Sequence, residues 1–270
     1  MEKTRISKIV KKDWNGFLNN KQRKNYSKYL FGILGIALFI AFWQLLSVIK
    51  SDPAIVKADV IAKSFFQIVT SKGFYANLLA TLKIVLIGIG IGTVVGIGLS
   101  ILIDLFEPFK KTVNPLIEIF RNIPSITLFP ILLVMYGIGD TARIFIIFWT
   151  ATPAIIISSV FGLRSVNISI IEAAQSFGAN KWTIMWRIKL PLAIPEILNG
   201  IRIGIGSGFV AIVVAEMLGA SKGLGFMVLW STNAFKYSET YAYIIIIGLI
   251  GAIVNCVMGV VIKIFERKYV

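Results

Sequence analysis

The chain has 270 residues, of which 57% are hydrophobic, and its mean hydropathy is +0.82. This composition excludes an ordinary soluble domain and favours an all-α membrane domain of about six helices, since each span needs roughly 20 apolar residues. The formal net charge of +15 would suggest nucleic-acid binding in a soluble protein, but membrane proteins collect basic residues on their cytoplasmic side. The sequence has no histidine, which excludes Ser-His-Asp and Cys-His catalysis and most zinc sites.

The first segment, residues 1–29, carries nine lysines and arginines interleaved with Trp14, Phe17 and Leu18. Such a segment is typical of a cytoplasmic arm that lies against anionic lipid. A nucleic-acid-binding tail is the alternative, and no other feature of the sequence supports it. We therefore expect a basic arm over 1–29, followed by a membrane domain over 30–270.

Six membrane spans are expected from runs of apolar residues. The segment 52–80 is too charged to be a span, and its apolar residues at helical spacing predict a helix along the outer interface. The apolar residues in question are Ile61, Phe65 and Ile68. The predicted spans cover roughly 30–49, 84–103, 115–136, 144–163, 196–218 and 243–262.

The distribution of basic residues predicts the orientation. If the amino terminus is inside, the inner segments hold eighteen lysines and arginines and the outer segments hold eight. Both termini are therefore expected in the cytoplasm, together with the loop 164–191.

Glycine recurs every four residues in several spans. The run "GIGIGTVVGIGLS" lacks the spacing of a dinucleotide fingerprint and lies inside a span, so close helix packing explains it better. A similar stripe of Gly251, Asn255 and Gly259 lies in the sixth span, and the single cysteine, Cys256, is expected to be a buried apolar residue. The stripes expected to pack helices are Gly88, Gly92 and Gly96, and Gly200, Gly204 and Gly208.

Charged residues and prolines within spans are candidate pathway residues. Arg121 and Arg202 lie near Glu118 and Glu196 in depth, which fits an internal ion-pair network, an anion-attracting inner vestibule, or side chains that reach the interface. Pro124 and Pro130 predict a bent third span lining a cavity, although kinks serving packing alone fit equally well. Glu216, near the outer end of the fifth span, is expected to face a gate or solvent.

The loop segment "EAAQSFGANKWTIMWRIKLP" predicts two short amphipathic helices. The first would place Ile168, Ile171 and Ala174 on one side and end at Gly178, since glycine tolerates a left-handed turn. The second would present Trp182, Met185 and Trp186 and stop at Pro191. An exposed aromatic face of this kind indicates a protein partner.

These residues resemble the EAA motif of binding-protein-dependent ABC transporter permeases. The elements of the motif are Glu172, Ala173 and Ala174, then Gly178, then Ile188 with Leu190 and Pro191. The segments "RNIPSITLFPILLVMYGIG" and "AEMLGASKGLGFMV" also resemble family signatures, as does "TLK" at Thr81. The overall pattern is most similar to the nitrate, sulfonate and taurine subgroup.

The resemblance implies a type I importer permease fold with six helices, in the plasma membrane of a prokaryote. It implies that the EAA loop docks on a cytoplasmic ATPase subunit, with Glu172 anchoring the loop and Gly178 making its turn. It also implies two ATPase subunits, a second permease copy forming a homodimer, and an extracytoplasmic binding protein. ATP and magnesium would sit on the ATPase, because this chain has no GxxxxGK[ST] run; the chain itself would be no enzyme and bind no cofactor.

Three alternatives remain open at the level of sequence. An intramembrane enzyme would need a polar pair, but Ser47 and Lys50 lie at a span end and Asp104 is expected to stand alone. A secondary transporter fits the helices but leaves the EAA spacing unexplained. For the transported solute, the subgroup suggests a small anion such as a sulfonate, taurine or nitrate, while a vitamin precursor is the alternative.

Overall fold

The structure is a computed structural model that describes residues 31–50 and 52–269; the predicted arm over 1–29 lies outside the described residues. All the regular structure in the described part is helical. The chain divides into two units, Met1–Ala62 and Lys63–Val270, and each is described by itself.

The first unit contains the helix Phe31–Ile49, whose apolar side chains point almost entirely outward. The chain that follows turns back onto this helix: Trp43 Nε1 donates to the Val56 carbonyl at 2.9 Å, and the Ala58 N–H donates to Gln44 Oε1 at 2.8 Å. An apolar helix with so little protein cover is stable only against lipid or another protein surface. It matches the first predicted span.

The helix α2 (Ala58–Thr70) has the predicted amphipathic pattern, with Ile61 and Ile68 buried and Phe65 half-buried. Within the second unit, its Ile68 packs beside Phe74 at the start of α3.

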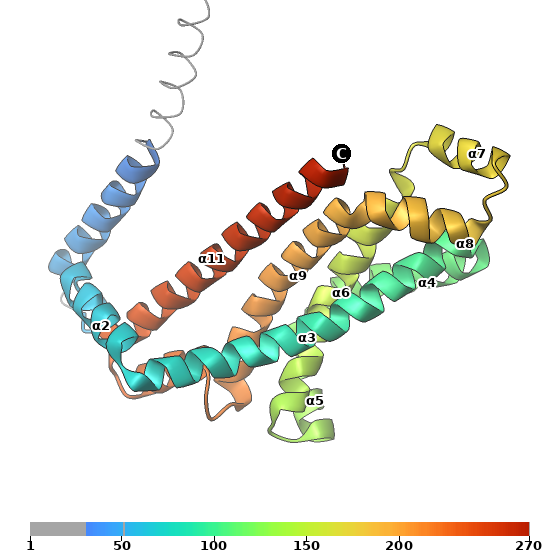
Figure 1. The fold of residues 1–270 in the computed structure, drawn as a ribbon. Helices are drawn as coiled ribbons and strands as arrows, with labels where there is room; N and C mark the ends of the chain where they lie inside the picture. The colour runs from blue at the N-terminus through green and yellow to red at the C-terminus, as the bar shows by residue number, and fades with distance from the viewer. Residues whose placement is uncertain (1–30, 51, 270) are drawn as a thin grey trace, which may run out of the picture. The chain divides into compact units, whose positions relative to one another are not determined.

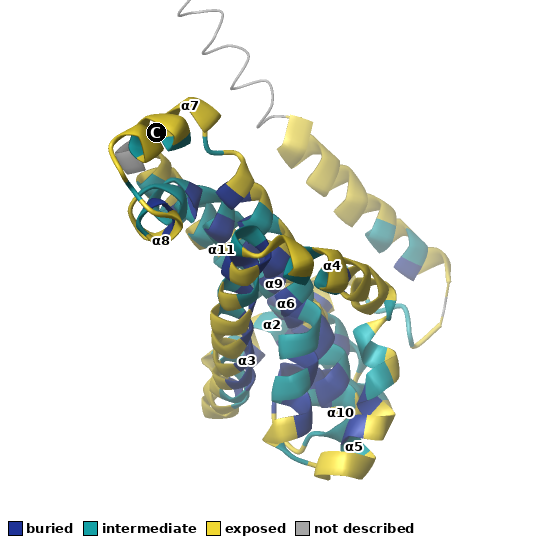
Figure 2. Ribbon diagram, turned by 90° about the vertical axis from the view of Figure 1, so that its right-hand side faces the viewer, coloured by how far each residue is buried: buried dark blue, intermediate teal, exposed yellow. Residues whose placement is uncertain are grey.

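Three long helices form the centre of the second unit (Figure 1). They are α3 (Lys72–Leu105), α6 (Asp140–Arg164) and α9 (Leu190–Gly219). The helix α6 packs against both of the others, and Ile146, Ile147 and Ile155 on it are completely buried. Burial coloured onto the ribbon shows this centre in dark blue and teal (Figure 2).

The third predicted span is bent, as its two prolines predicted. It consists of α4 (Glu107–Asn122), a short 3₁₀ turn (Ser125–Leu128) and α5 (Phe129–Tyr136), and the two parts meet at 87°. Pro124 cannot continue a helix, and it holds the preceding Ile123 in an extended conformation (φ −77°, ψ 116°). Pro130 lies in the first turn of α5, where proline is tolerated, so it begins a helix rather than kinking one.

The chain closes with α10 (Leu224–Asn233) and α11 (Tyr237–Tyr269). Across the described residues, five helices are long and apolar enough to span a membrane, or six if the bent pair is one span. Cys256 is exposed on α11, so the expectation that it is buried was wrong. A helix in a bilayer can turn apolar residues outward, which hydropathy alone does not reveal.

The glycine stripes of α3 and α9 face closely packed neighbouring helices, whereas Gly251 and Gly259 of α11 make only ordinary contacts, with a Cβ atom 3.8 Å from the nearest neighbour. A Cβ atom on Gly88 would lie 2.7 Å from Ile147 Cβ, and one on Gly200 would lie 2.7 Å from Ser158 Cβ. The other stripe glycines also face neighbouring helices: Gly92 meets Thr152, Gly96 meets Ile155, Gly204 meets Ala151, and Gly208 meets Ile147 and Ile89. Small residues thus allow α3 and α9 to pack on α6.

We predict that Gly88→Leu lowers stability by about 1–3 kcal/mol, because the added side chain must displace α6. The matched control is Gly90→Leu on the same helix, since nothing lies within 4 Å of a Cβ at Gly90. Thermal unfolding of the purified protein in detergent measures the difference. Equal midpoints for the two variants would contradict the packing role.

Candidate functional site: the loop between α6 and α9

The first arm of the loop is α7 (Ile168–Ser176), and its ends have clear local causes. Asn167 caps it by accepting the Ser169 N–H at 2.9 Å. At the other end, the Gly178 N–H donates to the Gln175 carbonyl at 2.8 Å while Gly178 adopts φ +82°, a region that favours glycine. The predicted first helix and its glycine turn are therefore present.

The second arm differs from the prediction. Asn180 caps α8 (Lys181–Ile184), which passes through a π-helical turn (Met185–Lys189) directly into α9. Pro191 was expected to stop this helix, but the helical run continues from Lys181 to Gly219. The wider π turn, in which the Leu190 N–H donates to the Met185 carbonyl, fits a proline that lacks an N–H and would crowd a regular α-helical turn.

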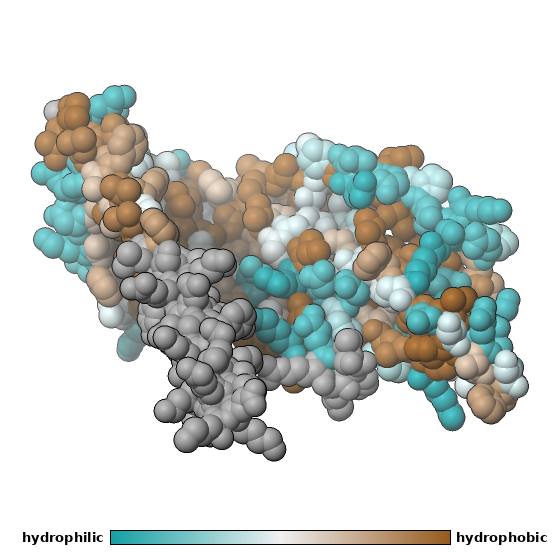
Figure 3. Space-filling view, turned by 90° about the horizontal axis from the view of Figure 1, so that it is seen from above, coloured by the Kyte–Doolittle hydropathy of each residue, from teal (hydrophilic) through white to brown (hydrophobic). Residues whose placement is uncertain are grey.

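Aromatic side chains stand out from the loop. Phe177 is 93% exposed, and Trp182 and Trp186 are 53% and 54% exposed. The end of the unit that carries α7 and α8 mixes hydrophobic and hydrophilic groups on its surface (Figure 3), and α7 is mostly exposed (Figure 2). Met185 does not share this face, contrary to the prediction, because it is fully buried beside Leu163 and Ala193.

The seven residues of the predicted coupling motif divide into two groups. The first group is exposed and consists of Glu172, Ala173 and Gly178. The second group is half-buried and consists of Ala174, Ile188, Leu190 and Pro191. Leu190 packs on the cluster around Met185. One part of the motif is thus displayed, and the other part holds the loop to the bundle.

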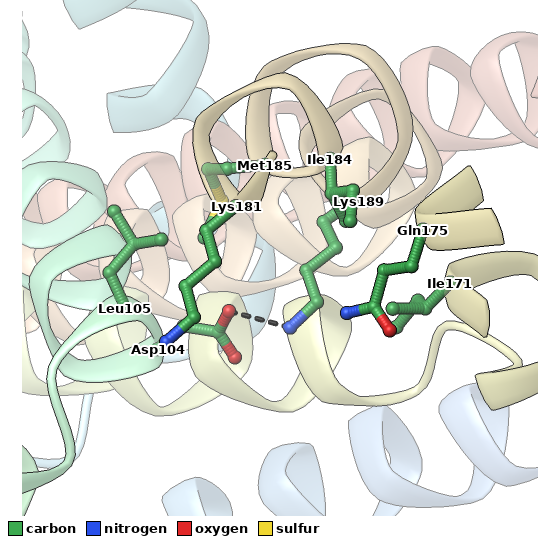
Figure 4. A pocket seen from close by; sticks show the side chains of 8 residues that line it. All are labelled: Asp104, Leu105, Ile171, Gln175, Lys181, Ile184, Met185 and Lys189. Atoms are coloured by element: carbon green, nitrogen blue, oxygen red, sulfur yellow. Dashed lines mark hydrogen bonds and ion pairs between the residues drawn. The ribbon is translucent and has the colours of Figure 1, made fainter. Parts of the chain in front are cut away.

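An ion pair that the sequence did not predict joins this loop to α3. Lys189 Nζ lies 2.7 Å from Asp104 Oδ2, and the two side chains are only 19% and 6% exposed (Figure 4). The pair borders a small pocket of about 180 Å³ that Ile171 and Gln175 of α7 also line. The expectation that Asp104 stands alone was therefore wrong, because residues 85 positions apart cannot be paired by local spacing.

We predict that Asp104→Ala destabilises the protein by about 3–5 kcal/mol, since it leaves the Lys189 ammonium unpaired in a largely buried place. Exchanging the two residues, as Asp104→Lys with Lys189→Asp, should recover part of this loss. The matched control is Glu107→Ala, whose pair with Lys110 is exposed and contributes about 0–1 kcal/mol. Thermal unfolding midpoints of the variants measure these differences in stability. An Asp104→Ala midpoint as little changed as that of Glu107→Ala would contradict the stabilising role of the pair.

Of the three roles left open for Arg121, Arg202, Glu118 and Glu196, the shared ion-pair network is not formed among the described residues. Arg121 Nε lies 2.8 Å from Glu118 Oε2 on the same helix, and both side chains are about half exposed. Arg202 instead donates from Nε to Asn255 Oδ1 on α11.

Glu216 does not face solvent, so that part of the expectation was wrong. It is completely buried, and its carboxyl group accepts from Thr81 Oγ1 at 2.8 Å and from the Gly225 N–H at 2.9 Å. Thr81 in turn accepts the Leu224 N–H at 2.9 Å. A second bond joins the same segments, from the Gly223 N–H to Asn77 Oδ1 at 2.9 Å. Together these bonds tie the start of α10 to α3 and α9.

Comparison with known proteins gives consistent matches. Residues 67–270 match the family described as "Binding-protein-dependent transport system inner membrane component". A putative ABC transporter permease protein of Methanocaldococcus jannaschii is 32% identical, over 81% of this chain and 84% of that one. The taurine transport system permease protein TauC of Escherichia coli is 33% identical over 65% and 64% of the two chains. A nitrate import permease protein of Leptolyngbya laminosa is 29% identical over 88% and 92%.

Solved structures share the fold. A structure of the MetNI methionine ABC transporter in an inward-facing conformation superposes with a TM-score of 0.64 at 21% identity. The match covers 73% of this chain and 99% of the other chain.

Proposed function

Because this chain belongs to the family of binding-protein-dependent transport system inner membrane components, as a permease subunit of an ABC importer, we propose that its 172–191 segment couples it to a separate ATPase. The observation that carries this proposal is the pair of helical arms around Gly178, which displays Glu172 and the aromatic side chains of Phe177, Trp182 and Trp186. An exposed apolar face beside polar groups is the usual form of a docking surface.

The connections of the loop support a mechanical role. The second arm is continuous with α9, so a displacement of α8 moves a membrane-spanning helix directly. The Asp104–Lys189 pair joins the same arm to α3. Closure of two ATPase subunits around ATP and magnesium would draw two such loops together and switch the permease between inward-facing and outward-facing states. This requires that the ATPase bind the two states with different affinity.

A second copy of this chain would complete the pathway, and a binding protein would deliver substrate from outside. The outward-facing apolar side chains of the helix Phe31–Ile49 and of α11 support a membrane environment with further protein contacts. A structure of a bacterial alginate ABC transporter, with a TM-score of 0.59, is described in complex with a periplasmic protein. The loop 164–191 and both termini would lie in the cytoplasm, as the basic residues indicate.

The substrate we propose is a small anion of the sulfonate or nitrate type. The relatives named for taurine and for nitrate support this class. The basic composition of the chain is compatible with an anion but does not by itself select one.

Uptake by intact cells tests this function. A strain that lacks the gene is compared with the same strain carrying wild-type protein, using labelled taurine, methanesulfonate, nitrate and a thiamine precursor. We expect the strain without the gene to lose uptake of at least one of the anions. In the strain with the wild-type protein, this uptake should depend on cellular ATP. If only uptake of the thiamine precursor is lost, the vitamin-precursor alternative is favoured. Uptake that is driven by the proton gradient without ATP would favour a secondary transporter.

A further inference from the structure

The helices α9 and α11 enclose a groove of about 510 Å³. Its lining is apolar or glycine except for three polar side chains, Asn199, Arg202 and Asn255. A mostly apolar concavity with a few converging polar groups is the usual form of a site for a small organic molecule.

The guanidinium group of Arg202 is held in a defined orientation. Its Nε donates to Asn255 Oδ1, which leaves the two terminal nitrogens for another acceptor. Gly259 lies beside these nitrogens: a Cβ atom there would be 3.8 Å from Arg202 Nη1. Asn199 lies one turn before Arg202 on α9 and lines the same groove.

The charge of Arg202 is not balanced by a carboxylate among the ion pairs of the described residues. Arginine stays protonated in proteins, so this charge is permanent. The residue lies within the predicted fifth span, six positions from the end of that span at residue 196, which is roughly 9 Å along the helix. A lone cation this far into a spanning helix is costly unless its side chain reaches the interface or faces water, a partner or a ligand.

The geometry points to an oxyanion subsite at Arg202, in which the guanidinium binds the sulfonate group of a small organic sulfonate and the apolar part of the groove takes its carbon chain. The planar guanidinium matches paired oxygens, and the groove is roomier than an inorganic oxyanion alone requires. This inference rests on the proposed function, because it names the substrate class and the residue that would recognise it. The phosphate of a membrane lipid shares this chemistry, so the test must separate the two sources.

The test uses the complete complex of permease, ATPase and binding protein in proteoliposomes, with labelled taurine, methanesulfonate and nitrate as probes. We expect Arg202→Gln to reduce uptake of the transported sulfonate by about 10- to 100-fold, the range of a lost charged hydrogen bond. Arg202→Lys should retain part of the uptake, because it keeps the charge but loses the paired geometry. Gly259→Val should also reduce uptake, since it crowds the guanidinium without changing charge. The control is Lys263→Gln, which removes an exposed cation of α11 outside the groove.

ATP hydrolysis by each complex is measured in parallel, and native mass spectrometry counts the bound phospholipids. Reduced uptake by a variant complex that still hydrolyses ATP supports the subsite. If the Arg202→Gln complex does not assemble, the uptake of the Arg202→Lys and Gly259→Val complexes tests the subsite instead. Undiminished uptake in these variants would overturn the subsite while leaving the importer function in place. Loss of a bound phospholipid with normal uptake would assign the guanidinium to lipid and also overturn it. A wild-type complex that transports none of the three anions would remove the proposed substrate class, and this inference with it.

Discussion

Glu216→Ala is expected to destabilise the protein by about 3–5 kcal/mol, because it removes a completely buried side chain and the acceptor for two donors. The Gly225 N–H and the Thr81 hydroxyl would then lose their partner inside the bundle, where water is excluded. The attachment of α10 to α3 and α9 depends on the same bonds, so the loss should spread to that helix. The thermal unfolding midpoint in detergent measures the overall effect, and hydrogen exchange of residues 220–233 measures the local one.

Two comparisons make this prediction specific. Thr81→Val should be destabilising and Thr81→Ser should be mild, since only the hydroxyl donates to Glu216 and accepts the Leu224 N–H. Glu118→Ala removes a glutamate whose pair with Arg121 is exposed, and it should change stability by less than about 1 kcal/mol. If Glu216→Ala behaved like Glu118→Ala, the cluster would have no stabilising role.

Gly178→Asp is expected to leave the protein folded and inserted but to abolish transport and assembly with the ATPase. The glycine adopts φ +82°, so a new side chain there adds backbone strain of about 1–2 kcal/mol, which the protein should survive. The larger effect is a charged group at the turn between the two displayed arms, where no described residue lies within 4 Å of a Cβ atom. Co-purification of the ATPase and uptake into proteoliposomes measure the loss.

Matched variants separate docking from strain. The variant Gly178→Asn tests the contribution of charge, because asparagine is nearly the size of aspartate, is uncharged and tolerates a left-handed conformation. Gly139→Asp places the same charge in the turn between α5 and α6, where Gly139 has extended backbone (φ −173°) and no described residue lies within 4 Å of a Cβ atom. We expect Gly139→Asp to assemble with the ATPase as the wild type does. Normal assembly and uptake with Gly178→Asp would refute the docking role.

Local patterns predicted the helices well, because hydropathy and caps act over a few residues. The spans 84–103, 144–163, 196–218 and 243–262 lie within observed helices, and the described part of the span 30–49 is the helix Phe31–Ile49. The turn at Gly178 follows from the residue type alone. The predicted bend of the third span is present at Pro124, and Pro130 begins the helix that follows it. The predicted stop at Pro191 is absent, because the π-helical turn before this proline lets the helix continue.

Long-range polar contacts could not be predicted from one sequence. Glu216 meets Thr81 across 135 positions, and Lys189 meets Asp104 across 85. A charge within an apolar run indicates only that a partner exists, and the packing of α3, α6 and α9 decides which residue it is. The sequence holds a weak signal for Glu216, since the segments that contain Thr81 and Glu216 both resemble family signatures.

Site-directed cross-linking from the loop tests the coupling of this permease to an ATPase most directly. The chain has one cysteine, so Cys256→Ser gives a cysteine-free background in which Phe177→Cys, at a position 93% exposed, carries a photoactivatable cross-linker. Ile138→Cys is the control, because it is 82% exposed and precedes the 25-residue α6, which places it roughly 35 Å from the loop. We predict that mass spectrometry finds a P-loop ATPase joined to Phe177→Cys, in an amount that changes with bound nucleotide, and no such product from Ile138→Cys. An intact complex in which Phe177→Cys reaches no ATPase, or in which Ile138→Cys reaches it equally well, would contradict coupling through this loop.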